Sequence, residues 1–204
     1  MRGKLITLEG IDGSGKSTVA KRLSENPKIL AHSPVFTREP TRNTLTGRAV
    51  EEAIGSDTDQ LAELFLFTAD HAEHISKLVR PALENGRPVI SDRYSDSRYA
   101  YQGMTLKGRL EAPLAWVRGL HRGWTIVPDL TFLFEIPPET AVERCGNRGD
   151  RTKFEKIEFL RGVREIFHTL AAEETERFVI IDADRPTEEV EAEVVEKILE
   201  TFEE

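Results

Sequence analysis

The sequence predicts an α/β domain in which a five-stranded parallel sheet carries helices on both faces. Three observations lead to this fold class. Short apolar runs alternate with longer amphipathic stretches, a glycine-rich pattern joins the first run to the first helical stretch, and 204 residues suit one domain. We expect residues 1–204 to form that single domain. The expected strands are Leu5–Leu8, Val35–Thr37, Arg87–Ser91, Asp129–Phe134 and Phe178–Ile181.

The first strand leads into Gly10-Ile-Asp-Gly-Ser-Gly-Lys-Ser17, which matches the pattern of a phosphate loop. Its glycines allow tight turns, so that successive backbone N–H groups converge on a phosphate. Lys16 adds a positive charge for the β- and γ-phosphate oxygens, and the Ser17 hydroxyl is placed to hold Mg²⁺. The helix expected from Thr18 would direct the positive end of its dipole at the anion. The predicted nucleotide-binding residues here are Gly10, Ile11, Asp12, Gly13, Ser14, Gly15, Lys16, Ser17 and Thr18.

Asp12 is unusual within an anion-binding loop. A carboxylate there is unfavourable unless it meets a metal, a cation or a hydroxyl. Aspartate also favours turns, so a purely conformational role is equally compatible with the loop. The sequence leaves both roles open.

Composition excludes several kinds of partner. The net charge of −8 argues against a nucleic-acid-binding surface, which would need a basic stripe. The single cysteine, Cys145, excludes an internal disulfide and is typical of a reducing cytoplasm. No apolar run approaches the roughly 18 residues of a membrane span, and the first strand follows the N-terminus without a signal peptide. We therefore expect a cytoplasmic protein with neither nucleic acid nor membrane as partner.

Arg38 follows the second strand, in the sequence Arg38-Glu39-Pro40. The proline disfavours helix at Glu39, so this tripeptide is expected in a loop at the carboxyl end of the strand. Ligands of open α/β sheets bind at that end. Arg38 could hold a second anionic group there, or it could be a surface arginine in a salt bridge.

A long helical pattern runs from Asp57 or Thr58 to about Asn85, and Pro81 should bend or weaken its last turns. Phe67 and His71 lie one turn apart on a second face, where they could stack on and read a base. His71 and His74 have a spacing that suits a metal, but the sequence shows no third ligand. The stripe expected to face the core consists of Leu61, Leu64, Phe65, Ala72, Ile75 and Val79.

Asp92 and Arg93 follow the third strand directly. Asp92 is placed like the acid that holds Mg²⁺ beside a phosphate loop, and Arg93 could neutralise a transferring phosphoryl group. The next segment, Ser97–Gly103, adds two tyrosines and Gln102. A glutamine amide can pair with a base edge as both donor and acceptor.

The second half of the chain predicts further helices and a basic segment. Trp116 and Leu120, in a helix expected over 113–123, should lie in the core. A segment at about 144–154 contains Arg144, Arg148, Arg151 and Lys153 interleaved with glycines. Such a segment suits a lid that closes on phosphates, although an exposed basic loop has the same composition. The remaining helices are expected from Pro137 to about Arg144, from Phe154 to Ala172, and from Pro186 onward.

Together these motifs resemble the thymidylate kinase family, whose members phosphorylate dTMP to dTDP with ATP and Mg²⁺. The resemblance extends from Leu5 to about Phe202. It implies a P-loop kinase fold, a transferase of dTTP biosynthesis and a homodimer. The matching segments are Gly10–Thr18, Thr37–Pro40, Phe67–His71, Asp92–Tyr94, Ala100–Gly103, Pro128–Thr131 and Arg148–Arg151.

The resemblance also implies roles for individual residues. The dTMP phosphate would lie between Arg38 and Arg93, and Phe67 would stack on thymine with Ser97, Gln102 and His71 near the polar edge of the base. Tyr101 would crowd the 2′ position of the sugar, and Asp12 would meet its 3′-hydroxyl. Ser17 and Asp92 would hold Mg²⁺, and Arg144 would join the ATP site. The implied catalytic residues are Asp12, Lys16, Arg93, Arg148 and Arg151.

Three positions depart from the family pattern. His71 stands where an arginine usually contacts thymine, Lys153 replaces a frequent glutamate, and Gly162 replaces a common arginine. A histidine should discriminate thymine from cytosine less than an arginine would, and dTMP binding should tighten as the pH falls toward about 6. The alternative is that His71 only packs beside Phe67.

The leading functional hypothesis is therefore a dTMP kinase. A kinase for another nucleotide, such as UMP or dUMP, is the closest alternative because of His71. A non-catalytic nucleotide switch is a further alternative, but it would need neither a second anion site nor a basic lid.

Overall fold

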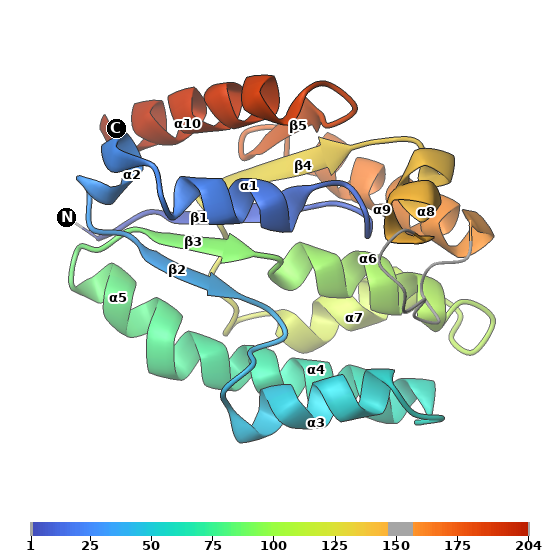
Figure 1. Cartoon of the computed structure of the whole chain (residues 1–204). Helices are drawn as coiled ribbons and strands as arrows, with labels where there is room; N and C mark the ends of the chain where they lie inside the picture. The colour runs from blue at the N-terminus through green and yellow to red at the C-terminus, as the bar shows by residue number, and fades with distance from the viewer. Residues whose placement is uncertain (1, 147–156, 204) are drawn as a thin grey trace.

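The computed structural model describes residues 2–146 and 157–203 (Figure 1). Within these residues, five strands form one parallel sheet in the order β2-β3-β1-β4-β5. This sheet, with helices on both faces, confirms the predicted fold class. The strands are β1 (Leu5–Glu9), β2 (Val35–Arg38), β3 (Val89–Asp92), β4 (Leu130–Glu135) and β5 (Phe178–Asp182).

Helices connect successive strands and cover both faces of the sheet (Figure 1). Helices α1 and α10 pack together over one face, whereas α6 packs with α7 and α9 over the other. The helices are α1 (Lys16–Leu23), α2 (Pro27–Leu30), α3 (Leu45–Ile54), α4 (Gln60–His74), α5 (Arg80–Glu84), α6 (Ser95–Thr105), α7 (Pro113–His121), α8 (Pro138–Gly146), α9 (Ile157–Glu173) and α10 (Thr187–Glu203). Among the described residues, no helix is both long enough and apolar enough to span a membrane.

The predicted long helix is α4, a π-helical segment η1 (Ile75–Val79) and α5 in direct succession. Asp59 begins it, because its carboxylate accepts the backbone N–H groups of Leu61 and Ala62. Pro81 has no N–H to donate to the preceding turn, and the wider π turn lies immediately before it. The predicted weakening near Pro81 therefore takes the form of a local change in helix type.

The predicted core stripe of this helix is partly wrong. Phe65 is 49% exposed and Ala72 also faces solvent, whereas Asp70 and His71 are completely buried. Asp70 accepts hydrogen bonds from the backbone N–H and the hydroxyl of Thr41, which makes its burial tolerable. A pattern of apolar residues alone cannot reveal such a buried polar face. Trp116 is likewise 38% exposed rather than in the core.

Helices α2 and α3 were not predicted. Thr44 caps α3 by accepting the N–H of Gly47, and a Cβ on Gly47 would collide with the Thr41 carbonyl. This glycine lets α3 approach the loop that follows β2, and that loop forms one wall of the candidate site. Gly162, a departure from the family pattern, has a similar explanation: a Cβ there would collide with Met104, so α9 packs tightly on α6.

Candidate active site

The carboxyl ends of β1, β2 and β3 meet at one edge of the sheet. The strand register places Leu8 and Arg38 on either side of Asp92. The phosphate loop, the loop after β2 and the turn after β3 therefore converge on one place. This is the edge where ligands of parallel sheets bind.

The phosphate loop closes around the side chain of Lys16. Gly13 and Gly15 have φ angles of 85° and 93°, which glycine adopts readily. The Lys16 ammonium donates to the Ile11 carbonyl at 2.7 Å and to Ser14 Oγ at 2.9 Å. Burial lowers the pKa of Lys16 to about 7. An adjacent phosphate would favour the charged form again, because an anion stabilises the ammonium.

Ser17 and Asp92 form a pair that fits a magnesium ion. Ser17 Oγ donates to Asp92 Oδ2 at 2.6 Å, and Asp92 Oδ1 is buried without a hydrogen-bond partner among the described residues. A carboxylate oxygen without a partner, next to a hydroxyl at a phosphate loop, suits a cation. In the described ranges no three His, Cys, Asp or Glu side chains cluster as metal ligands. Mg²⁺ beside phosphates needs no such cluster, since it binds through one or two carboxylates, phosphate oxygens and water.

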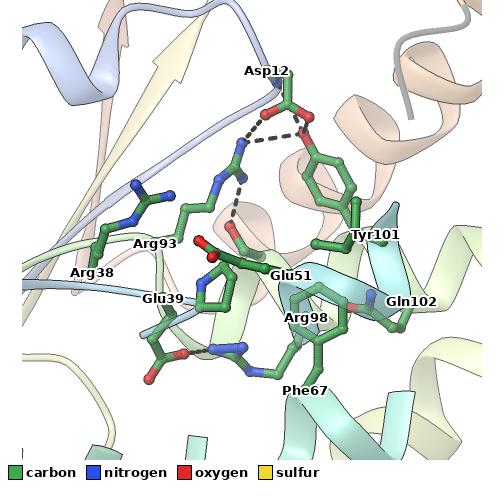
Figure 2. Close-up of a pocket in the computed structure, with 12 residues that line it drawn as sticks. Asp12, Arg38, Glu39, Glu51, Phe67, Arg93, Arg98, Tyr101 and Gln102 are labelled. Atoms are coloured by element: carbon green, nitrogen blue, oxygen red, sulfur yellow. Dashed lines mark hydrogen bonds and ion pairs between the residues drawn. The ribbon is translucent and has the colours of Figure 1, made fainter. Parts of the chain in front are cut away.

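A cavity of about 260 Å³ opens beside the phosphate loop (Figure 2). Arg38 and Arg93 lie at one end, and the Nε atom of Arg38 is buried without a partner among the described residues. Burial, with other arginines nearby, lowers the pKa of Arg38. An anion between these two guanidinium groups would relieve their repulsion. The other end of the cavity is lined by Phe67, Arg98 and Gln102.

Arg93 joins the cavity to the phosphate loop through hydrogen bonds. Its guanidinium donates to the Gly10 carbonyl at 3.2 Å, to Ser97 Oγ at 2.9 Å and to Asp12 Oδ1 at 2.5 Å. The Tyr101 hydroxyl donates to Asp12 Oδ2 at 2.9 Å and accepts the Asp12 N–H at 2.9 Å (Figure 2). These bonds fix the cationic end of the cavity relative to the loop.

These contacts decide between the two roles left open for Asp12, because its carboxylate meets both a cation and a hydroxyl. Burial alone would raise the pKa of Asp12, but the Arg93 guanidinium holds it below the usual value. Asp12 is therefore ionised at neutral pH and serves as the counter-ion of Arg93.

Glu9 is a buried carboxylate that the sequence analysis missed. It accepts the Tyr94 N–H at 2.8 Å and the Ser97 hydroxyl. Burial raises the pKa of Glu9 to about 7. The Ser97 hydroxyl donates to Glu9 and accepts from Arg93, so Ser97 helps to position Arg93. An acid that ends an apolar strand directly before Gly10 was the available signal.

The structure corrects the prediction that His71 reads the base. His71 is completely buried and is not among the residues that line the cavity. Its Nδ1 lies 2.8 Å from Glu39 Oε1 and its Nε2 lies 3.2 Å from Thr125 Oγ1. Both ring nitrogens are thus engaged, and the ring packs edge-on against Tyr94. The buried carboxylate of Glu39 needs donors, and His71 supplies one of them.

Arg98 lines the cavity instead, and the sequence analysis missed it too. It is 2% exposed and forms an ion pair with Glu39. The available signal was its position on α6, one helical turn before Gln102. Residues four apart on a helix share a face, so a predicted role for Gln102 implied a place beside it for Arg98.

Protonation of the buried histidines should destabilise the fold in acid. Burial lowers the pKa of His71 to about 3 and that of His74 to about 4. Because the folded-state pKa values lie below the ordinary value of about 6.5, this stability is complete above pH 6.5 and is lost as the pH falls toward 4. At about pH 5 the loss should be on the order of 2 kcal/mol per histidine, set by protonation of the unfolded chain.

His71→Gln should reduce this loss between about pH 7 and 5, since an amide can replace both hydrogen bonds without titrating. The measurement is the free energy of unfolding in urea at both pH values. His32→Gln is the matched control, because His32 is exposed. An equal pH dependence in wild type and His71→Gln would mean that His71 has the same pKa in the folded and unfolded states, which would contradict this prediction. A neutral His71 also removes the basis for dTMP binding that tightens with acid.

Arg144, for which the resemblance implies a contact with ATP, lies beside the phosphate loop. It donates to the Ala183 carbonyl at 3.1 Å and to Asp184 Oδ1 at 2.8 Å. A second cavity, of about 310 Å³, is lined by Arg144 and Ala183 together with Gly13 and Gly15 of the loop. Its position suits the nucleoside part of a phosphate donor. Arg148 and Arg151 lie outside the described residues.

A phosphate loop, a hydroxyl and carboxylate for a cation, and a facing cationic cavity define the class of P-loop kinases that act on nucleotides. The model of the family Thymidylate kinase matches residues 8–194. A protein of Methanosarcina acetivorans named "Probable thymidylate kinase" is 76% identical over 200 residues, which cover 98% of this chain and 97% of the relative. A protein of the same name from Methanococcoides burtonii is 61% identical over 203 residues, which cover 100% of this chain and 100% of the relative. Another, from Natronomonas pharaonis, is 52% identical over 200 residues, which cover 98% of this chain and 97% of the relative. The chain belongs to the thymidylate kinase family.

Proposed function

We propose that this protein transfers the γ-phosphoryl group of ATP to dTMP, with Mg²⁺ as cofactor, and releases dTDP and ADP. One observation carries the proposal: the cavity of about 260 Å³ lies beside the phosphate loop, with two arginines at its near end and an aromatic ring at its far end. Relatives named as thymidylate kinases support dTMP as the nucleotide in that cavity.

Each end of the site has its own task in the reaction. Arg38 and Arg93 hold the monophosphate, and Lys16 with the loop N–H groups holds the donor phosphates. Ser17 and Asp92 would hold Mg²⁺, which neutralises charge on the β- and γ-phosphate oxygens. With both substrates fixed in line, positioning and charge neutralisation supply most of the catalysis.

The remaining cavity residues suit the nucleoside of dTMP. Phe67 offers a face for stacking on thymine, and Gln102 offers an amide for the base edge. Asp12, held by Arg93 and Tyr101, lies where a 3′-hydroxyl could donate to it. From the sequence, Arg148 and Arg151 would add charge to the transferring phosphoryl group from a lid, and Arg144 would contact ATP.

The decisive experiment is ADP release from ATP and Mg²⁺, measured with a coupled assay on a panel of nucleoside monophosphates. We expect the highest kcat/KM with dTMP. Faster turnover of UMP or dUMP would favour a kinase for another nucleotide. That alternative was based on His71 contacting the base, and the burial of His71 argues against such a contact. If no phosphate donor supported dTMP-dependent turnover, a nucleotide switch would be the remaining hypothesis. A switch would not require the cavity that Arg38 and Arg93 line.

Tyr101 is expected to exclude ribose from the sugar position, since it lines the cavity and contacts Asp12. Tyr101→Ala should narrow the preference for dTMP over its ribonucleotide counterpart, measured as the ratio of kcat/KM values. Tyr101→Phe keeps the ring but loses the hydrogen bond to Asp12, so it should retain the preference while weakening dTMP binding. A ratio unchanged in Tyr101→Ala would assign sugar selection to another residue.

We further propose a homodimer formed through one face of α4. Its exposed positions include Ala62, Phe65, Ala69 and Ala72, with no charge among these four, and Phe65 packs edge-on against the exposed Trp116. Solvent-facing helix surfaces are normally charged, so this face suits burial against a second copy.

Phe65→Glu should convert the dimer to a monomer in light scattering coupled to size exclusion. Val127→Glu is the matched control, because Val127 is 62% exposed and lies outside α4, between α7 and β4. A monomeric wild type, or a dimer unaffected by Phe65→Glu, would contradict this interface.

We also propose a cytoplasmic location for this enzyme. Cys145 is the single cysteine, so the chain cannot form an internal disulfide and has no need of an oxidising compartment. Its proposed substrates are soluble nucleotides of that compartment.

A further inference from the structure

Arg98 is the one cationic side chain at the far end of the cavity, within the described lining residues. It reaches from α6 along the cavity beside Phe67 toward Glu39 (Figure 2). Only 2% of the residue is exposed, and its Nε atom has no hydrogen-bond partner in the described ranges. Burial lowers the pKa of Arg98 only to about 10, so the guanidinium remains charged near neutral pH.

A dedicated set of contacts holds this guanidinium in place. Glu39, which is 1% exposed, pairs with Arg98 and lies 2.8 Å from His71 Nδ1 and 2.6 Å from His74 Nδ1. The remaining ring nitrogen of His74 lies 2.7 Å from Thr37 Oγ1. With Nδ1–H groups donating to Glu39 and Nε2 atoms accepting from threonines, both histidines are satisfied in their neutral form. In this arrangement neither histidine competes with Arg98 as a cationic partner of Glu39.

We propose that Arg98 is the specificity-determining residue for the base, and that it selects pyrimidines with an oxygen at position 4 over those with an amino group. The inference rests on the proposed function, because it assumes that a pyrimidine nucleotide occupies the cavity. Glu39, with His71 and His74 behind it, acts as the positioning residue for the guanidinium.

The chemistry of the two base edges supplies the selection. Thymine presents an acceptor at O4, whereas cytosine presents an amino donor at the same position. A guanidinium has only donors, so it can bond to O4 but opposes the amino group. An uncharged Gln102 can turn its amide to suit either edge, so it cannot make this distinction alone. The methyl group of thymine is not a hydrogen-bond acceptor, so the guanidinium cannot donate to it.

The test is the ratio of kcat/KM values for dTMP and dCMP in wild type and Arg98→Gln. Loss of a hydrogen bond to a charged donor should lower kcat/KM for dTMP about 10- to 100-fold, and the ratio to dCMP should fall by at least about tenfold. The ratio of dTMP to dUMP should stay unchanged, because both bases carry O4. A general loss of cavity structure would lower all three values together.

Two further variants complete the test. Arg109→Gln is the matched control, because Arg109 forms an exposed ion pair with Asp59 outside the cavity. If Arg98→Gln does not fold, the double variant Glu39→Gln with Arg98→Gln removes both buried charges and keeps acceptors for the histidines. A folded variant, shown by its melting transition, that discriminates dTMP from dCMP as well as wild type does would overturn the proposal.

Failure of the proposed function would have a different signature. A wild type without dTMP-dependent ADP release contradicts the kinase activity alone, and calorimetric affinities for dTMP and dCMP then test Arg98 without turnover. Tighter binding of dTMP that depends on Arg98 would support the base-selecting role in that case, and equal affinities would refute it.

Discussion

Replacement of Lys16 by alanine is expected to reduce the turnover number for dTMP phosphorylation by about 10³-fold or more. Removal of a preorganised electrostatic donor typically costs 10²- to 10³-fold, and charged groups that contact a transferring phosphoryl group cost about 10³ to 10⁵. Lys16 combines both properties, since the loop holds its ammonium by hydrogen bonds to Ile11 and Ser14. The loss should be in turnover rather than only in substrate affinity.

The fold should tolerate this change. The Lys16 side chain packs within its own loop, and its contacts link residues only two and five positions away. Lys16→Ala should therefore show a large fall in the single-turnover rate but only a small shift in the melting temperature. Lys21→Ala is the matched control, because Lys21 is an exposed lysine of the same helix α1. Equal turnover in Lys16→Ala and wild type would remove the phosphate loop from the mechanism.

The sheet and the phosphate-binding edge could be predicted from the sequence because their signals are local. Each strand is a short apolar run, and the loop Gly10–Ser17 carries its own pattern of glycines, lysine and serine. Parallel pairing then brings the last residues of β2 and β3, Arg38 and Asp92, to the same edge. The position of the anion-binding end of the site follows from this topology.

The base end could not be predicted in the same way, because it depends on which polar side chains are buried. His71 lies one helical turn from Phe67, as a residue that contacts the base would, but its side chain is buried in a hydrogen bond with Glu39. That contact joins a loop after β2 to α4, and no periodicity in either segment specifies it. Arg98, from a third element, α6, lines the cavity where His71 does not.

Buried polar side chains also explain why the sequence analysis assigned the wrong face of α4 to the core. Asp70 and His74 are buried because Thr41 and Glu39 satisfy them, whereas the apolar Phe65 and Ala72 face outward. Hydrophobic periodicity assumes that apolar side chains mark the core side of a helix. A helix with a buried polar network on one side and exposed apolar side chains on the other reverses that assumption.

Replacement of Arg93 by alanine should lower kcat/KM for dTMP by about 10³-fold or more, because it removes a cation from the phosphate of one substrate and from the transferring group. The variant should also leave the buried carboxylate of Asp12 without its counter-ion, since the two form an ion pair. Part of the loss would then reflect a disturbed loop rather than a lost contact with substrate. A double-mutant cycle with Asp12→Asn separates the two contributions.

In the cycle, Asp12→Asn alone should cost much less than Arg93→Ala, because the amide oxygen can still accept from Arg93 and the amide NH₂ group can donate to the Tyr101 hydroxyl. Introducing Arg93→Ala into the Asp12→Asn background should still reduce kcat/KM by at least about 10²-fold, since the substrate phosphate would lose its cation in either background. Arg118→Ala is the control for general loss of an arginine, because Arg118 pairs with Glu173 on α9, away from the phosphate loop. If Arg93→Ala had no further effect once Asp12 was neutral, the guanidinium would serve only to hold Asp12, and the phosphate of dTMP would depend on Arg38 alone.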